Sequence, residues 1–235
     1  MKRNIMKILA LMLALMLVLC ACGESEEQVG GNVTPIATET PATEVPEAQM
    51  SLGQIEGGIY ANSYLDLQIA LDSSWVYKSA EELQELPTDV ADLFKDTELA
   101  EDMAGLQQFT DMMAESVEQM ASINVLFQKL DMKTRLAYAA LSEEQIIDAT
   151  MEQADVLRAA YTAAGIMVEK MEKVTVTFMG QERTAIKTTA SIQDIPYFTL
   201  QIFEFKRGQY SATITLATYL EDNTESLLDL CSPIA

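Results

Sequence analysis

The chain has 235 residues, with 36 acidic and 15 basic side chains and a net charge of −21. A surface this acidic excludes nucleic acid as a partner, because the phosphate backbone would be repelled. The absence of histidine excludes Ser-His-Asp and Cys-His nucleophiles and histidine-ligated zinc. The sequence also has no phosphate-binding loop, dinucleotide-binding glycine motif or calcium loop, so we expect no cofactor and no metal.

The N-terminus is expected to be a signal peptide. Lys2, Arg3 and Lys7 precede residues 8–19, which form a run without a polar side chain. Such a run is typical of a secretory signal and is too short to span a membrane, which needs about 20 apolar residues. It ends in Leu19-Cys20-Ala21-Cys22, which resembles the lipobox of bacterial lipoproteins.

The lipobox resemblance implies that residues 1–21 are removed and that Cys22 carries a diacylglyceryl group. Two acyl chains hold a protein stably at a membrane. The resemblance therefore implies a palmitate-type anchor on the outer face of the cell membrane of a Gram-positive-type bacterium. Processing would leave 12 basic against 36 acidic side chains, a net charge of −24. The alternative is an ordinary signal peptide that is cleaved elsewhere.

Residues 22–52 are expected to form a disordered tether that begins at the lipidated cysteine. The segment is rich in threonine, proline and glutamate and has no aromatic side chain, so it buries too little apolar surface to fold. Proline and charge repulsion favour an extended chain. A single domain is expected over residues 53–235. Within it Cys231 is the one remaining thiol, and we expect it to be free and buried.

The first half of the domain predicts strands followed by short helices. Residues 60–64 predict a short strand and a turn, and residues 65–71 alternate apolar and polar side chains, which is typical of a strand with one buried face. Ser79 followed by glutamates predicts the start of a helix. That helix is expected to run to about residue 86 and to break at Pro87, with further short helices over 88–94 and 97–106.

A hairpin is expected from residues 109–115 and 121–130. The second of these segments is apolar on both sides, which indicates a central strand. Met112, Met113 and Met120 lie close to this hairpin. We favour a role in core packing for these methionines, and an adaptable binding surface is the alternative.

The second half of the domain predicts one long helix and an antiparallel meander. Ser142 and Gln145 have the spacing of a capping box, and Gly165 is the expected end of the helix. Alternating segments then predict strands, and a final helix should bury Cys231. The order of elements favours an α+β fold, in which helices pack on an antiparallel sheet. The predicted strands are 174–178, 184–192, 198–202 and 210–216, and the final helix is 222–231.

Several residues resemble PsbP-like domains of clostridial-type surface lipoproteins. They are Tyr60-x-Asn62-x-Tyr64-Leu65, Trp75, the turn Gly180-Gln181-Glu182 and the end Leu228-Asp229-Leu230-Cys231-Ser232-Pro233-Ile234. Asp66, Asp72 and Ser74 depart from the pattern of that group. The resemblance covers about residues 53–234. It implies a small α/β/α sandwich with a binding or assembly role and no shared catalytic residues.

Tyr60, Tyr64, Trp75 and Tyr77 are the candidate binding surface, for an apolar or sugar ligand. We favour packing of these aromatic rings over one edge of the sheet, because aromatic residues dominate protein cores. No catalytic residue is assigned. The sequence therefore favours a membrane-anchored, non-enzymatic binding or scaffolding protein, with an envelope protein or wall polymer as its partner. The alternative is an extracytoplasmic, carboxylate-dependent hydrolase that acts on cell-wall or glycan material.

Overall fold

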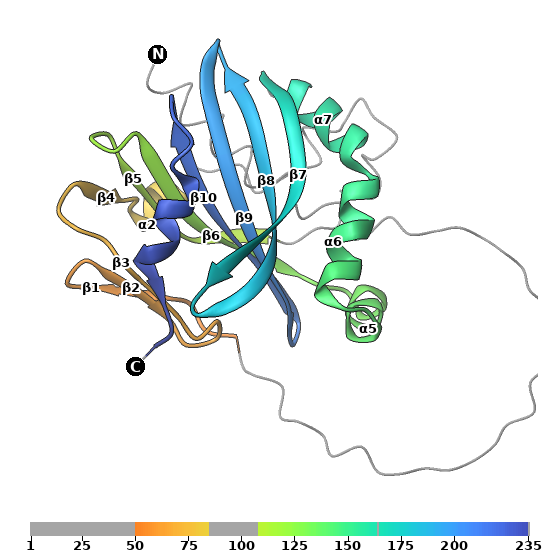
Figure 1. The fold of residues 1–235 in the computed structure, drawn as a ribbon. Helices are drawn as coiled ribbons and strands as arrows, with labels where there is room; N and C mark the ends of the chain where they lie inside the picture. Colours follow the sequence, from red (N-terminus) through yellow and green to blue (C-terminus); the bar gives the residue numbers. More distant parts are fainter. Residues whose placement is uncertain (1–49, 85–107, 164, 235) are drawn as a thin grey trace, which may run out of the picture.

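The protein folds as two antiparallel β-sheets, with helices packed on the larger one (Figure 1). The computed structural model describes residues 50–84, 108–163 and 165–234. The expected α+β class with an antiparallel sheet is confirmed. The signal peptide, Cys22, most of the tether, Pro87 and the helices expected over 88–94 and 97–106 lie outside the described residues.

The larger sheet has, within the described residues, the strand order β4-β5-β6-β10-β9-β8-β7, and every neighbouring pair is antiparallel. The hairpin and the meander are both confirmed, and the apolar second strand of the hairpin is buried on both faces as expected. The strands are β4 (Trp75–Tyr77), β5 (Gln108–Ser116), β6 (Ala121–Lys129), β7 (Ile166–Phe178), β8 (Gln181–Ile192), β9 (Ile195–Arg207) and β10 (Tyr210–Tyr219).

Strand β7 begins eight residues earlier than the sequence pattern predicts, at Ile166 instead of 174. The register with β8 shifts between Val168 and Lys170, so Glu169 is the extra residue of a bulge. A bulge interrupts the alternation of side chains between the two faces. The charged residues around it therefore hide the strand from a search for regular alternation.

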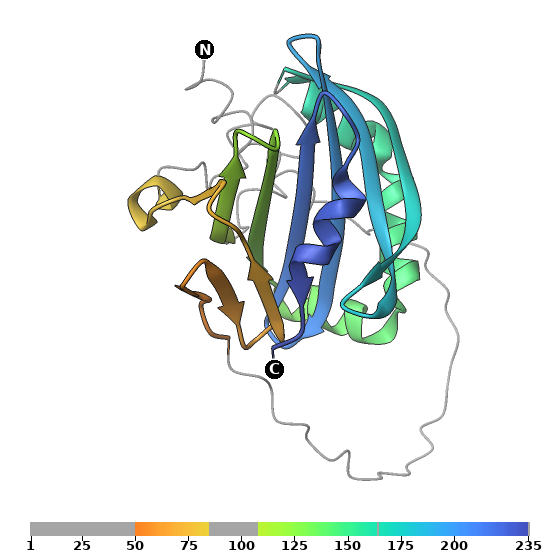
Figure 2. The same ribbon diagram turned by 60° about the vertical axis from the view of Figure 1, so that its left-hand side comes forward.

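The smaller sheet joins the two ends of the domain. Its strand order is β1-β2-β3-β11, and Cys231 of β11 lies opposite Ile69 of β3. This sheet lies against one face of the larger sheet (Figure 2). The strands are β1 (Gln54–Glu56), β2 (Ile59–Asn62), β3 (Leu67–Ala70) and β11 (Cys231–Ser232).

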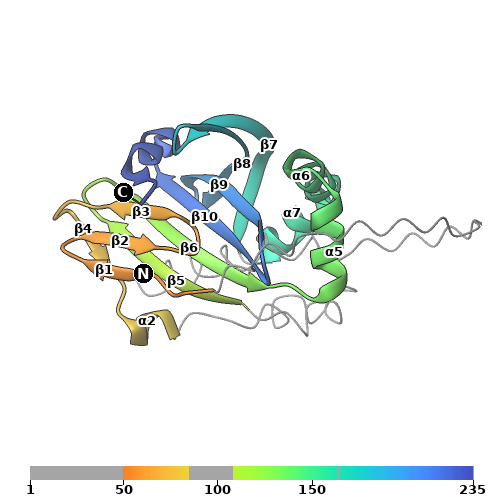
Figure 3. The ribbon, with the colours of Figure 1, turned by 90° about the horizontal axis from the view of Figure 1, so that it is seen from below.

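The helices are distributed over both faces of the larger sheet. Helices α5, α6 and α7 pack on the face away from the smaller sheet, over β7, β8 and β9 (Figure 3). The 3-10 helix η2 lies on the same face as the smaller sheet, so that layer consists largely of strands. The helices are α2 (Ala80–Gln84), α5 (Met132–Ala140), α6 (Glu143–Glu152), α7 (Ala154–Ala163) and η2 (Thr224–Leu230).

The long helix expected over residues 142–165 is two helices. Its capping box is confirmed, since Ser142 Oγ accepts from the Gln145 amide and the Gln145 side chain accepts from the Ser142 amide. The helix then breaks at Gln153, whose amide bonds to the Thr150 carbonyl three residues back. The Thr150 hydroxyl also donates to the Ile146 carbonyl, and this kind of back-bonding bends helices.

The final helix is also shorter and tighter than predicted. It is a 3-10 turn over Thr224–Leu230, and Cys231 lies outside it as the first residue of β11. The Ser226 amide bonds to the Asn223 carbonyl three residues earlier, which is the 3-10 spacing. The pairing of β11 with β3 therefore ends the helix, because residue 231 must be extended to join the smaller sheet.

Candidate functional site

The four aromatic residues predicted as a binding surface lie between the two sheets. Tyr60, Tyr64 and Trp75 are almost fully buried, and Tyr77 is partly buried. All four belong to or pack against the hydrophobic cluster between the sheets. Their position matches the packing role that the sequence favours for these rings. These rings present little surface to a ligand in this conformation.

The hydroxyls of the three tyrosines connect the smaller sheet to the larger one. The Tyr60 hydroxyl donates to Asp111 Oδ2 at 2.6 Å, and the same oxygen accepts from Asn62 Nδ2 and from the Gly53 amide, both at 2.8 Å. Asp111 is the bulge residue of β5, where the register with β6 shifts. The bulge turns the carboxylate toward the smaller sheet, so it joins three donors from the start of the domain.

A different group of residues gathers at one end of the larger sheet. Three loops, which we call the loop tip, lie side by side there, because the Tyr219 amide bonds to the Met120 carbonyl and the Leu220 amide bonds to the Pro196 carbonyl. The loops follow the strand order β6-β10-β9. The loop tip consists of residues 117–120 between β5 and β6, residues 193–196 at the turn between β8 and β9, and residues 220–223 after β10.

The loop tip exposes large apolar side chains. Val117 is 80% exposed, Leu220 56%, Met120 40% and Ile195 36%. Scattered exposed apolar residues are normal on a protein surface, but a contiguous group marks an interaction site. Of the three methionines near the hairpin, Met112 and Met113 are core residues, as favoured from the sequence, and Met120 alone reaches the surface.

Two of these apolar residues have an unfavourable backbone conformation. Met120 has a φ of 50° and Leu220 a φ of 70°. Residues other than glycine adopt this left-handed conformation at a cost of roughly 1–2 kcal/mol. Glycine would fit both positions without that cost. The fold therefore carries strain at two exposed apolar residues of the loop tip.

The turns at the opposite end of the larger sheet also need residues with a left-handed backbone, and there glycine occupies such positions. Gly180 in the β7–β8 turn and Gly208 in the β9–β10 turn have φ values of 76° and 82°. Met179, beside Gly180, is also left-handed, but its side chain packs against the core between the sheets. Burial offsets the strain at Met179. No comparable burial offsets it at Leu220.

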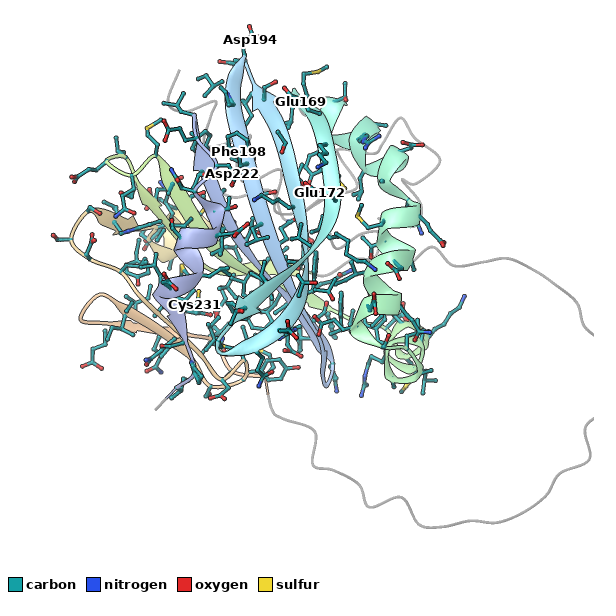
Figure 4. The ribbon with its side chains drawn as sticks, in the orientation of Figure 1. Glu169, Glu172, Asp194, Phe198, Asp222 and Cys231 are labelled. Atoms are coloured by element: carbon teal, nitrogen blue, oxygen red, sulfur yellow. The ribbon has the colours of Figure 1, made fainter. Side chains whose placement is uncertain are left out.

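Each loop of the loop tip also carries an exposed acidic residue. Glu118, Asp194 and Glu221 are exposed, and within the described residues none of them forms an ion pair. Asp194 projects from the far end of the β8–β9 hairpin (Figure 4). Asp222 is the exception, since its carboxylate contacts Lys187 Nζ at 2.8 Å. The three loops contain no basic residue.

A band of polar side chains is buried on the helix-facing side of the larger sheet. Thr213 of β10 lies between Leu126 of β6 and Phe203 of β9, which both belong to the helix-side core. The Thr213 hydroxyl and several polar groups near it have no hydrogen-bond partner among the residues that the structure describes. Each such group weakens the fold unless water or another molecule satisfies it. These groups are both side-chain amide atoms of Gln108, the hydroxyls of Ser122, Thr188 and Ser211, and the side-chain carbonyl oxygens of Asn124 and Gln201.

Metal binding and membrane spanning find no support in the described part of the chain. No group of acidic or cysteine side chains there is arranged to hold a metal ion. Within the same ranges, no helix combines the length and apolar character needed to cross a membrane.

By its fold the chain is an antiparallel α+β protein with a two-sheet core. No protein-family model matches the chain, and no curated protein matches it. Among solved structures it is similar to the solution structure of cyanobacterial PsbP (CyanoP) from Synechocystis sp. PCC 6803, with a TM-score of 0.43 and 10% sequence identity over 83% of this chain and 100% of that chain. A likeness of this size assigns neither a family nor an activity.

The sequence signal for the loop tip was weak. The sequence offers Met120, with Met112 and Met113, as an alternative binding surface, but Leu220 and Val117 have no distinctive sequence context. The first two loops are separated by 73 residues in the sequence, from 120 to 193. All three loops meet only because of the strand order of the folded sheet. A turn without glycine, at a position that requires a left-handed residue, is recognisable only once the backbone angles are known.

Proposed function

We propose that this protein is a lipid-anchored protein of the outer face of the cell membrane that acts without catalysis, by binding a partner protein of the envelope through the loop tip. The observation behind the proposal is the pair Met120 and Leu220. Both are exposed and apolar, and both occupy backbone positions at which glycine would be more favourable.

The left-handed backbone of Met120 and Leu220 is strained, and burial of their side chains does not offset that strain. Such strain is typical of a functional site. Non-glycine residues held in left-handed conformations cluster at binding and switch sites. Burial of Leu220 and Met120 against a partner would regain apolar free energy of about 25 cal/mol per Å². The isolated domain does not gain that energy, because these side chains face solvent. A binding role accounts for both the conformation and the side-chain type.

The position of the loop tip suits a tethered protein. The described chain begins, in orange, at the lower end of the domain, whereas the β8–β9 hairpin and the end of β10 lie at the upper end (Figures 1 and 2). A tether that enters at the lower end would leave the loop tip facing away from the anchor. Tethering raises the effective concentration of a binding surface toward neighbours in the same membrane or wall.

The anchor is tested with Cys22→Ala. We expect the unmodified chain to incorporate labelled palmitate and to sediment with membranes, and we expect the variant to lose the label and the membrane association. A variant that is still processed and still sediments with membranes would show that the lipobox interpretation is wrong.

The binding surface is tested with a photo-crosslinking amino acid placed in cells at Val117, and separately at Leu136 as a control. Leu136 is 65% exposed on α5, outside the loop tip. We expect a protein adduct of discrete mass from position 117 and none from position 136. The adduct should disappear when Met120→Gly and Leu220→Gly are introduced. Identical adducts from both positions, or an adduct that survives both glycine substitutions, would contradict the proposal.

A further inference from the structure

We infer that the partner surface that covers the loop tip is a basic protein surface, with apolar side chains at its centre and lysine or arginine around them. The inference rests on the proposed function, since it names the chemistry that the same surface recognises. It follows from the combination of exposed apolar residues with unpaired acids on three neighbouring loops.

The exposed apolar residues of the loop tip, which we call its apolar centre, lie on three adjoining loops. Leu220 follows the central strand β10. Its N–H donates a hydrogen bond to the Pro196 carbonyl and the Tyr219 N–H donates one to the Met120 carbonyl, which places one neighbouring loop on each side. Adjacent strands lie about 4.8 Å apart, so the three strands span about 10 Å. That width matches the diameter of one α-helix. An amphipathic helix is therefore a suitable probe for this surface.

Each loop also carries one exposed acidic residue, and we call these three acids the rim. Glu118, Asp194 and Glu221 are exposed and unpaired within the described residues, one on each loop. Asp222 is neutralised by Lys187. Typical interfaces place apolar residues in the centre and polar or charged residues at the rim, where charge decides which partner associates. A rim with three carboxylates and no base favours a cationic partner.

The same charges argue against the other occupants. A second copy of this chain would bring an identical acidic rim, and like charges would face one another across a two-fold axis. Anionic lipid headgroups and an anionic wall polymer would be repelled by the loop tip and by the net charge of the whole chain. A basic protein surface can bury the apolar centre and can also pair its positive charges with the acidic rim.

The test compares two charge reversals of equal size. The first variant carries Glu118→Lys, Asp194→Lys and Glu221→Lys. The control carries Glu56→Lys, Glu152→Lys and Glu182→Lys, which are exposed acids on β1, α6 and β8 without an ion pair in the described residues. Both variants change the net charge by the same amount, so a difference between them reports the loop tip and not the overall charge.

The probes are a synthetic amphipathic peptide of leucine and lysine and its leucine–glutamate counterpart. Binding is measured by fluorescence anisotropy on the full mature chain, at low and high salt. We expect the lysine peptide to bind, the loop-tip reversal to weaken binding by about tenfold, and the control reversal to weaken it by no more than about twofold. Salt should weaken binding to the unmodified chain more than binding to the loop-tip variant.

Three results would overturn the inference. Equal weakening by both reversals would show that only net charge attracts the peptide. Equal binding of the glutamate peptide would show that the rim has no preference. The third result is either concentration-dependent dimers in sedimentation or binding to phosphatidylglycerol vesicles. If the loop-tip substitutions abolish either one, the occupant is a second copy of the chain or a lipid surface.

A third variant separates this inference from the proposed function. Met120→Gly with Leu220→Gly removes the apolar centre and leaves every charge in place. If these glycines abolish the crosslinks in cells but the charge reversal changes nothing, the proposed function holds and the basic partner is wrong. If the crosslinks persist with the glycines, the proposed function fails. Circular dichroism of each variant confirms that it is folded.

Discussion

The hydroxyl of Tyr60 in the smaller sheet donates a 2.6 Å hydrogen bond to Asp111 Oδ2 in the larger sheet. Tyr60 is fully buried, and burial together with the nearby Asp111 carboxylate raises the pKa of Tyr60 well above its usual value. The neutral phenol is thus held as a donor to a carboxylate that receives two further hydrogen bonds. This contact joins the beginning of the domain to the bulge in β5.

Substitution Tyr60→Phe should destabilise the domain by roughly 1.5–3 kcal/mol, because it removes a hydrogen bond to a charged acceptor and leaves Asp111 short of a donor. The matched control is Tyr77→Phe, which removes a 3.0 Å bond to the neutral carbonyl of Gly58. That change should cost about 1 kcal/mol. Urea unfolding measures both. If Tyr60→Phe lowers the free energy of unfolding by no more than Tyr77→Phe does, the charged acceptor Asp111 does not strengthen the hydrogen bond.

Stability should fall above about pH 10, the usual pKa of tyrosine. Burial raises the pKa of Tyr60, Tyr161, Tyr197 and Tyr219 in the folded protein. Below pH 10 both states keep the phenolic protons and stability is complete. Above it the unfolded chain ionises while the folded protein does not, so each tyrosine removes roughly 1.4 kcal/mol per pH unit.

This pH dependence is measured by urea unfolding between neutral and alkaline pH, with tyrosinate absorbance recorded on the native protein. Tyr161→Phe removes one of the four phenols whose pKa is raised in this way and should make the alkaline decline shallower. Native tyrosines that all ionise near pH 10 without loss of structure would contradict the burial of these groups.

Substitution Thr213→Val should leave stability unchanged or raise it by about 1 kcal/mol. The Thr213 hydroxyl is buried without a hydrogen-bond partner among the described residues, so valine removes an unsatisfied group at nearly constant volume. The control is Thr150→Val, whose hydroxyl donates to the Ile146 carbonyl. Thermal unfolding compares the two. A loss of stability at Thr213 would instead indicate that water or another molecule is bound in the polar band.

The thiol of Cys231 should react very slowly in the native protein. Its prediction as a buried free thiol is confirmed, and burial raises its pKa to about 12. Because the thiolate is the reactive form, the raised pKa alone predicts labelling roughly a thousandfold slower than in unfolded chains. Rates with a thiol reagent, with and without urea, measure this. Native labelling at the unfolded rate would place Cys231 at the surface.

Local signals predicted some elements well and failed at others for identifiable reasons. The capping box of Ser142 and Gln145 and the apolar hairpin strand depend on neighbours in sequence, and both are confirmed. The bulge at Glu169 hid the first part of β7, and back-bonding by Thr150 accompanies a break that contains neither glycine nor proline. The final helix ends before Cys231, because Cys231 belongs to β11 and pairs with a strand more than 160 residues away in the sequence.

In the candidate site too, some features follow from the local sequence and others only from the tertiary structure. From the sequence, Tyr60, Tyr64, Trp75 and Tyr77 were either a binding surface or packing residues, and only the position of the smaller sheet shows that they face the core. The opposite holds for Leu220, which the sequence did not single out. Its exposure and its left-handed backbone both result from the way β10 ends between two other loops.

The sequence by itself determined the acidic charge, the lack of histidine chemistry, the antiparallel α+β class and the free thiol, because composition and local periodicity are properties of neighbouring residues. The tertiary structure alone decided that Asp111 meets Gly53, Tyr60 and Asn62, and that three distant loops meet in one surface. Those contacts depend on strand order and register, which long-range pairing sets and no local pattern encodes.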